Sequence, residues 1–166
     1  MQMRTWWIDE PLVLASGNPA DGELARLRAQ GFSVAVSLLE ERKQPPRYAR
    51  QSATLAGWSI HSIPVEEGGT PSVDQVREFT ARITRLPEGT KVLVHCESGL
   101  GRAAFMGAAY WIARGLTARE AIARVQQATA SVGWRTAERA RRLQQYEKLQ
   151  RDAGTKRRPR VPTTAR

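Results

Sequence analysis

Cys96 and Arg102 are the residues with the clearest chemical potential, and five residues separate them. They lie in a segment that leaves the apolar run 92–94 and enters a helical pattern around Phe105. Ligands in open α/β sheets bind at the carboxyl ends of strands, where Cys96 is expected. A loop that runs into a helix N-terminus directs backbone N–H groups and the positive end of the helix dipole toward one point. The segment therefore predicts an anion-binding loop.

The residue types in this loop suit a phosphate group. Gly99 and Gly101 let the backbone approach oxygen atoms without a Cβ clash. The planar guanidinium of Arg102 can bind two oxygens at once, which a lysine cannot do. We predict that phosphate is bound by the residues that follow the cysteine: Glu97, Ser98, Gly99, Leu100, Gly101 and Arg102.

Cys96 is predicted to act as a nucleophile. The field that binds a phosphate also favours a thiolate over a thiol, so we expect an ionised cysteine at neutral pH. A thiolate beneath a bound phosphorus atom can attack in line and form a phosphocysteine, which water then hydrolyses. The alternative is a cysteine with only a structural role in a strand-to-helix turn. The spacing to Arg102, the two glycines and the preceding His95 argue against that alternative.

The elements that must position these residues alternate along the chain. Short apolar runs predict buried strands within 34–39, 58–63 and 92–94. Helical periodicity predicts helices over 72–86, from about 105 to 114, after Thr117 and over 136–150, and Ser72 and Thr117 are capping candidates. Strands alternating with helices predict an α/β fold, with a central, mainly parallel, twisted sheet flanked by helices.

Length and charge predict one domain with a basic tail. A chain of 166 residues is long enough for a single core, which we place at 1–153, with a basic C-terminal tail at 154–166. The net charge is +10, and five of the positive side chains lie in the tail. Positive charge favours anionic partners without specifying them. We interpret the tail as solvated, with a nucleic-acid or membrane-surface patch as the alternative.

Cysteine use and hydropathy predict a cytoplasmic protein. With a single cysteine, no intrachain disulfide can form. Residues 1–17 lack the apolar stretch of a secretory signal, and the run 103–113 is too short to cross a bilayer. No cluster of Cys, His and acidic residues has metal-ligand spacing, so we predict neither a metal nor a cofactor.

The loop resembles the motif of the cysteine-dependent protein tyrosine phosphatase superfamily, which is His-Cys, five residues and Arg, with glycines at the positions of Gly99 and Gly101. The chain is most similar to the small atypical dual-specificity phosphatases, from about Leu12 to Leu149. Residues 36–39 resemble the early strand of that family, 63–67 its general-acid loop and 71–79 the following helix. Two other phosphatase families fit less well. Low-molecular-weight phosphatases carry their motif at the start of the chain, whereas Cys96 lies well inside this one. Rhodanese-like cell-cycle phosphatases lack the glycine pattern.

The resemblance implies roles for residues around the loop. His95 would support the loop and the cysteine from behind. The general acid of the family is Asp, and here Glu67 stands at the matching position; Glu66 is the reserve candidate, and a solvated Glu67 without a catalytic role is the alternative. Ala103 replaces the Ser or Thr that donates a hydrogen bond to the departing sulfur, which puts the turnover rate, but not phosphate binding, in question.

The resemblance implies hydrolysis of phosphate monoesters, with phosphotyrosine as the main substrate and phosphoserine or phosphothreonine as further ones. The expected partner is a phosphorylated protein or peptide, and small phosphate esters or oxyanions would occupy the loop; no nucleic-acid partner is expected. Alternatives are a phosphate-binding pseudophosphatase and a phosphatase of phosphoinositides or RNA 5′-phosphates. Glu97 stands where lipid phosphatases of this superfamily often carry Lys, which disfavours polyphosphorylated substrates.

Overall fold

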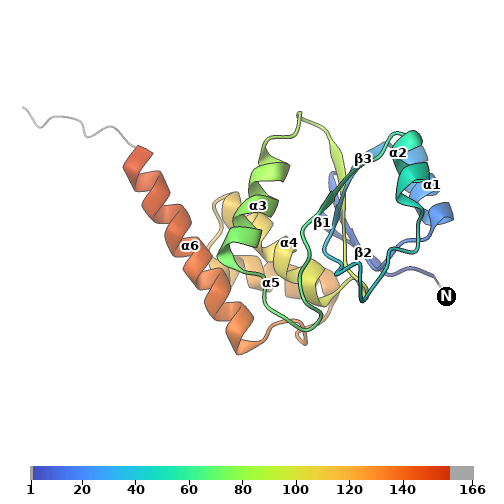
Figure 1. The fold of residues 1–166 in the computed structure, drawn as a ribbon. Coiled ribbons are helices and arrows are strands. Elements are labelled where there is room, and N and C mark those ends of the chain that lie inside the picture. Colours follow the sequence, from blue (N-terminus) through green and yellow to red (C-terminus); the bar gives the residue numbers. More distant parts are fainter. Residues whose placement is uncertain (1, 158–166) are drawn as a thin grey trace, which may run out of the picture.

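A computed structural model describes residues 2–157 of the chain (Figure 1). In that range the chain forms five strands and six helices, and they follow one another in this order: β1 (Thr5–Asp9), β2 (Val13–Ser16), α1 (Asp21–Ala29), β3 (Phe32–Ser37), α2 (Arg50–Leu55), β4 (Ser59–Ser62), α3 (Val73–Thr84), β5 (Lys91–His95), α4 (Gly101–Ala113), α5 (Ala118–Thr129) and α6 (Ala137–Arg157).

The strands form one twisted, mostly parallel sheet in the order β1-β2-β5-β3-β4. Only the pair β1 and β2 is antiparallel. The strand β5 is central, because Val94 pairs with Ala15 of β2 on one side and with Val36 of β3 on the other. The predicted α/β architecture is confirmed, and Cys96 follows the carboxyl end of the central strand.

The two faces of the sheet are covered by different helices (Figure 1). Alternate side chains of a strand point to opposite faces. On one face, Leu14, Ala35 and Leu93 pack with buried residues of α1 and α2. On the other face, the valines of β2, β3 and β5 pack against α3, α4, α5 and α6 in the larger hydrophobic core.

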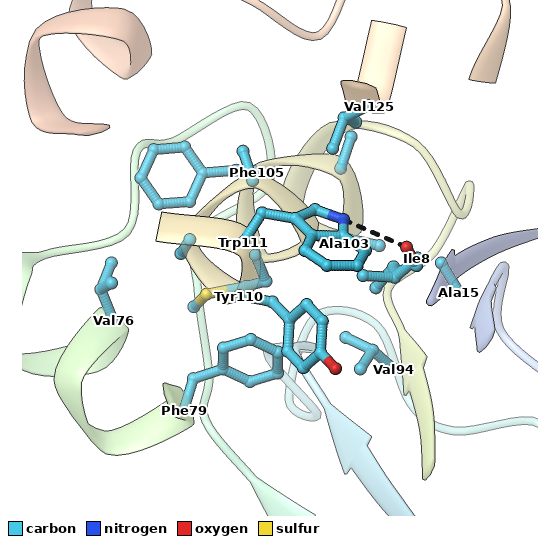
Figure 2. Packing of buried hydrophobic residues seen from close by; sticks show 14 of the residues in the cluster. Ile8, Ala15, Val76, Phe79, Val94, Ala103, Phe105, Tyr110, Trp111 and Val125 are labelled. Carbon is cyan, nitrogen blue, oxygen red and sulfur yellow. Dashed lines mark hydrogen bonds between the residues drawn. The ribbon is translucent and has the colours of Figure 1, made fainter. Parts of the chain in front are cut away.

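The helix α4 lies at the centre of the larger core and is buried on all sides from Arg102 to Ile112. Figure 2 shows Phe105, Tyr110 and Trp111 of this helix among side chains from the sheet and from α3 and α5, and the indole Nε1 of Trp111 donates a 3.1 Å hydrogen bond to the carbonyl of Ile8. Truncating a side chain such as Phe105 in this core would cost about 3–5 kcal/mol of stability. The first turn of α4 therefore has little freedom to move.

Two predicted helix starts are confirmed by their caps. The hydroxyl of Ser72 accepts a 3.1 Å hydrogen bond from the Gln75 N–H, and Thr117 caps α5 in the same way through Glu120. Such caps satisfy N–H groups that have no partner within the helix.

Other boundaries differ from the prediction. The sequence patterns missed β1, β2, α1 and α2, and β3 ends at Ser37, before the two leucines that were assigned to it. The helix α6 continues to Arg157 and so enters the segment predicted as a tail, whose remaining residues, 158–166, lie outside the described part of the chain. No helix within residues 2–157 combines the length and the apolar character needed to cross a membrane.

Candidate active site

The loop between β5 and α4 forms an anion cradle. Cys96 is 1% exposed at its start, and α4 begins at Gly101. Within residues 2–157, the N–H groups of five residues of this loop and of the start of α4 donate to no protein acceptor, namely those of Glu97, Ser98, Gly99, Gly101 and Arg102. Donors that converge at a helix N-terminus bind anions. The loop is therefore built to receive an oxyanion beside the sulfur of Cys96.

Residues from β1 and from the segment after β2 hold the backbone of the loop. The carbonyl of Gly99 accepts a 2.7 Å hydrogen bond from the indole Nε1 of Trp6, and the carbonyl of Glu97 accepts one of 3.1 Å from the Asn18 N–H. Gly99 has a φ of +80°, and a Cβ at this position would lie 2.5 Å from the backbone nitrogen of Gly17. Only glycine therefore fits there.

The guanidinium of Arg102 is fixed by the loops that follow β3 and β4. Its Nη1 donates to the carbonyls of Val65, at 2.9 Å, and Leu38, at 3.3 Å, and its Nη2 donates to Oε1 of Gln44 at 2.9 Å. Within the described part of the chain, the Nε–H and one N–H of Nη2 have no acceptor. Because a guanidinium carries five donors, these two remain for a ligand, and their neighbouring positions suit a bidentate oxyanion.

A cavity of about 370 Å³ opens over the cradle. Cys96, Ser98, Leu100, Gly101 and Arg102 line it on the side of the loop. Of the two adjacent glutamates, Glu67 lines this cavity together with Gly68. The structure thus brings together the predicted nucleophile, the predicted phosphate-binding arginine and the first choice for the general acid.

His95 lies beneath the loop and is fully buried. Its Nε2 is 3.1 Å from the hydroxyl of Tyr48. Burial lowers the pKa of His95 from its ordinary value of 6.5 to about 3; a backbone contact with Cys96 opposes this, and the charges of Arg102 and Arg50 add to it. The imidazole is therefore neutral at physiological pH. Ala103, at the other predicted supporting position, is also fully buried in the first turn of α4.

The side chain of Glu97 is bound to Asn18. Its carboxylate accepts a 3.0 Å hydrogen bond from the side-chain amide of Asn18, which also donates to the carbonyl of Pro45. The side chain is therefore held against Asn18 and does not line the cavity described above. The expectation that the charge of Glu97 disfavours polyphosphorylated substrates stays a prediction.

The opposite wall of the cavity was missed in the sequence. It consists of Ser131, Gly133 and Trp134, from the segment between α5 and α6, and Arg139, from the first turn of α6. Arg139 is only 5% exposed. The pattern of an outer, amphipathic helix hid this residue among several other arginines, and no local signal in the sequence sets it apart.

Within residues 2–157, no three His, Cys, Asp or Glu side chains lie together in a way that could hold a metal ion.

Comparisons with known proteins agree with this geometry. Residues 8–150 match the family model described as DSP-PTPase phosphatase fused to NAD+ kinase. Tk-PTP in its active form is a similar solved structure, with 33% sequence identity, a TM-score of 0.75, and coverage of 87% of this chain and 96% of that one. A search of curated proteins returned no match.

More distant structures share the fold. PTPMT1 in complex with PI(5)P is 21% identical, with a TM-score of 0.78 and coverage of 89% of this chain and 96% of that one. The human tyrosine phosphatase-like serine/threonine/tyrosine-interacting protein is 20% identical, with a TM-score of 0.71 and coverage of 87% and 96%.

Proposed function

Because this chain belongs to the DSP-PTPase phosphatase family, whose model it matches over residues 8–150, we propose that it hydrolyses phosphate monoesters through a phosphocysteine on Cys96. The observation that carries the proposal is the set of five unpaired backbone N–H groups beside Cys96, together with the two free N–H groups of Arg102. These donors match the three non-bridging oxygens of a phosphate ester. The same donors stabilise the charge that these oxygens carry in the transition state.

In the first step, the thiolate of Cys96 attacks phosphorus and the ester P–O bond breaks. Glu67, as a carboxylic acid, gives its proton to the departing oxygen, and an alcohol or phenol leaves. In the second step, water attacks the phosphocysteine, Glu67 takes a proton from that water, and the S–P bond breaks. Inorganic phosphate and the thiolate are formed, and Glu67 is again an acid.

Phosphotyrosine, with phosphoserine or phosphothreonine as further substrates, is the substrate class that the resemblance to dual-specificity phosphatases supports. The family description favours a second candidate. NAD+ kinase makes the 2′-phosphate ester of a dinucleotide, and a phosphatase fused to it could act on that same ester. The phosphoinositide bound to PTPMT1 makes a lipid phosphate a third class worth assaying.

The test compares wild type with Cys96→Ser on a chromogenic aryl phosphate, a phosphotyrosine peptide, NADP+ and a phosphoinositide. Wild type should release phosphate, and a brief acid quench with labelled substrate should trap the phosphorylated enzyme. Cys96→Ser should show neither, while it still binds inorganic phosphate through the backbone and Arg102. Turnover by Cys96→Ser near the wild-type rate would exclude the covalent mechanism, and no turnover by wild type would favour a phosphate-binding pseudophosphatase.

A further inference from the structure

A second guanidinium, that of Arg139, is built into the cavity over Cys96. Its Nε and Nη2 both donate to the carbonyl of Gly69, at 3.2 and 2.8 Å, and its Nη1 donates to the carbonyl of Trp134 at 2.8 Å. Two backbone carbonyls from different segments therefore hold this buried side chain in one position. A cation that is already fixed in a cavity can bind an anion without the entropy cost of ordering a solvated side chain.

Within residues 2–157, no carboxylate lies at ion-pair distance from Arg139, although the charge of Glu138 acts on it from farther away. Burial lowers the pKa of Arg139; a thiolate at Cys96 raises it, the charge of Arg102 lowers it, and Glu138 raises it. A buried charge without an ion-pair partner is unfavourable for folding, even where carbonyl groups accept its hydrogen bonds. Its persistence here is explained if an anionic ligand completes the site.

The remaining donors of Arg139 point to a ligand that accepts hydrogen bonds. A guanidinium has five N–H groups and no acceptor. Three are used by the two carbonyls, which leaves one on each Nη atom. A Cβ placed on Gly101 would lie 3.6 Å from both of these nitrogens, so the end of the side chain lies beside the cradle. Because it cannot accept a proton, Arg139 cannot act as a base toward water.

One phosphate does not need these donors. Its three non-bridging oxygens accept about two hydrogen bonds each. The five backbone N–H groups and the two free N–H groups of Arg102 already provide more donors than that. Trp134 adds a further unused donor in the same wall, because its Nε1 is buried without an acceptor within the described residues. The cavity thus has donors in excess of what the reacting phosphate can accept.

We propose that Arg139 forms a subsite for a second anionic group of the substrate, a phosphate or a carboxylate, next to the ester that is cleaved. The subsite rests on the proposed phosphatase function and narrows its substrate class to monoesters that carry another negative charge. The carboxylate of Glu97, which accepts a hydrogen bond from Asn18, does not line the cavity that contains Arg139.

The test uses matched substrates that differ only in whether they carry a second anionic group. Phenyl phosphate is compared with meta- and para-carboxyphenyl phosphate, and adenosine 2′-phosphate with adenosine 2′,5′-bisphosphate. The ortho isomer is omitted because its carboxylate acts on its own ester. For wild type, kcat/KM should be at least tenfold higher for at least one probe that carries the second anionic group than for its matched partner. The two pairs distinguish a carboxylate from a phosphate as the second group.

Three variants separate the subsite from a structural role of Arg139. Arg139→Gln should lose at least tenfold of this preference while it still hydrolyses phenyl phosphate. Arg139→Lys should keep part of it, because the charge remains. Arg142→Gln is the matched control: Arg142 lies on the same helix and donates to the carbonyl of Pro71, and it does not line the cavity. This control should keep the full preference.

The outcomes are distinguishable. If Arg139→Gln lowers kcat/KM equally for all substrates, the subsite is overturned. The role of Arg139 would then be to hold the turn at residues 66–69, whose Gly69 carbonyl it binds. Hydrolysis of phenyl phosphate by wild type without any preference would overturn the subsite and leave the phosphatase function standing. No hydrolysis of any ester would contradict the proposed function itself. If Arg139→Gln does not fold, inhibition of the wild-type enzyme tests the subsite. Pyrophosphate should inhibit it at least tenfold more strongly than inorganic phosphate does. Equal inhibition by the two would overturn the subsite.

Discussion

The indole Nε1 of Trp6 donates a 2.7 Å hydrogen bond to the carbonyl of Gly99, and both groups are buried. The bond joins the first strand to the anion cradle, across 93 positions of the sequence. It fixes the orientation of one peptide group in the loop. With this carbonyl bound from behind, the neighbouring N–H groups stay available for the ligand.

Trp6→Phe should weaken phosphate binding. The change keeps most of the buried ring and leaves the Gly99 carbonyl without its donor, which costs about 1–3 kcal/mol. If about 1.4 kcal/mol of this appears in binding, the inhibition constant for inorganic phosphate rises about tenfold. Trp111→Phe is the control, since it also loses an indole bond to a buried carbonyl, that of Ile8. Equal effects of both variants on phosphate binding would contradict a specific role for Trp6.

Gly99→Ala should abolish most of the activity. A non-glycine residue at positive φ costs about 1–2 kcal/mol, and the added Cβ would also overlap the backbone of Ser16 and Gly17. The loop must therefore move, and kcat/KM on an aryl phosphate should fall by about 100-fold or more. Gly89→Ala has a similar φ of +81° with open space around it. It should lose stability only, as thermal unfolding would reveal.

Glu67→Gln should slow the hydrolysis of esters with poor leaving groups. A general acid contributes roughly 10²–10⁴-fold when the leaving oxygen needs a proton, and much less for an activated aryl phosphate. The limb of the pH–rate profile that reports the acid should also disappear. Glu66→Gln, one position away, should leave the rate of hydrolysis of both kinds of ester unchanged. A larger effect at Glu66, or equal losses on both substrates with Glu67→Gln, would reassign the acid.

Ala103→Ser should raise the steady-state rate. The methyl group of Ala103 cannot donate a hydrogen bond to the departing sulfur, and a charge-assisted bond is worth about 1.5–3 kcal/mol, or roughly 10- to 100-fold in rate. Wild type should therefore show a pre-steady-state burst when breakdown of the phosphocysteine is limiting. Because the serine must fit at a fully buried position, thermal unfolding checks that the Ala103→Ser variant is folded. A linear time course and no gain with serine would show that another donor supports the thiolate.

His95 should make the protein sensitive to acid. Its pKa is lowered from 6.5 in the unfolded chain to about 3 in the folded one. Between these values the unfolded state binds more protons, so stability is complete above about pH 6.5 and is lost as the pH falls toward 3. One proton corresponds to a slope of about 1.4 kcal/mol per pH unit. Denaturant unfolding of His95→Asn between pH 6 and 4 should show a shallower slope by up to this amount, and identical slopes would contradict the buried neutral imidazole.

Local sequence patterns were sufficient to predict the cradle segment and three of the five strands of the sheet. Cys96, the glycines and Arg102 occupy one continuous strand–loop–helix segment, so their geometry follows from neighbours in the sequence. The strands β3 and β5 are continuous apolar runs because both of their faces are covered. In contrast, α1 has only two buried leucines and no side-chain cap, and α2 is six residues long, so neither produces a clear helical pattern.

The parts of the site that could not be predicted come from distant segments. Gln44 reaches Arg102 across 58 positions, and Arg139 reaches Gly69 across 70. In the sequence, these residues are polar side chains among many others. Their roles depend on how the helices pack on the sheet, and a pattern along the chain carries no record of that packing.

The attachment of Arg102 has an evolutionary consequence. Its Nη1 joins the carbonyls of Leu38 and Val65, so the residue that receives the anion also connects the ends of two neighbouring parallel strands. A descendant that had lost catalysis would still need this arginine to hold its fold, whereas no hydrogen bond of the described structure depends on the sulfur of Cys96. Among relatives of this chain, a retained arginine is therefore weak evidence that the protein is an active enzyme. Loss of the cysteine is the better sign that catalytic activity has been lost.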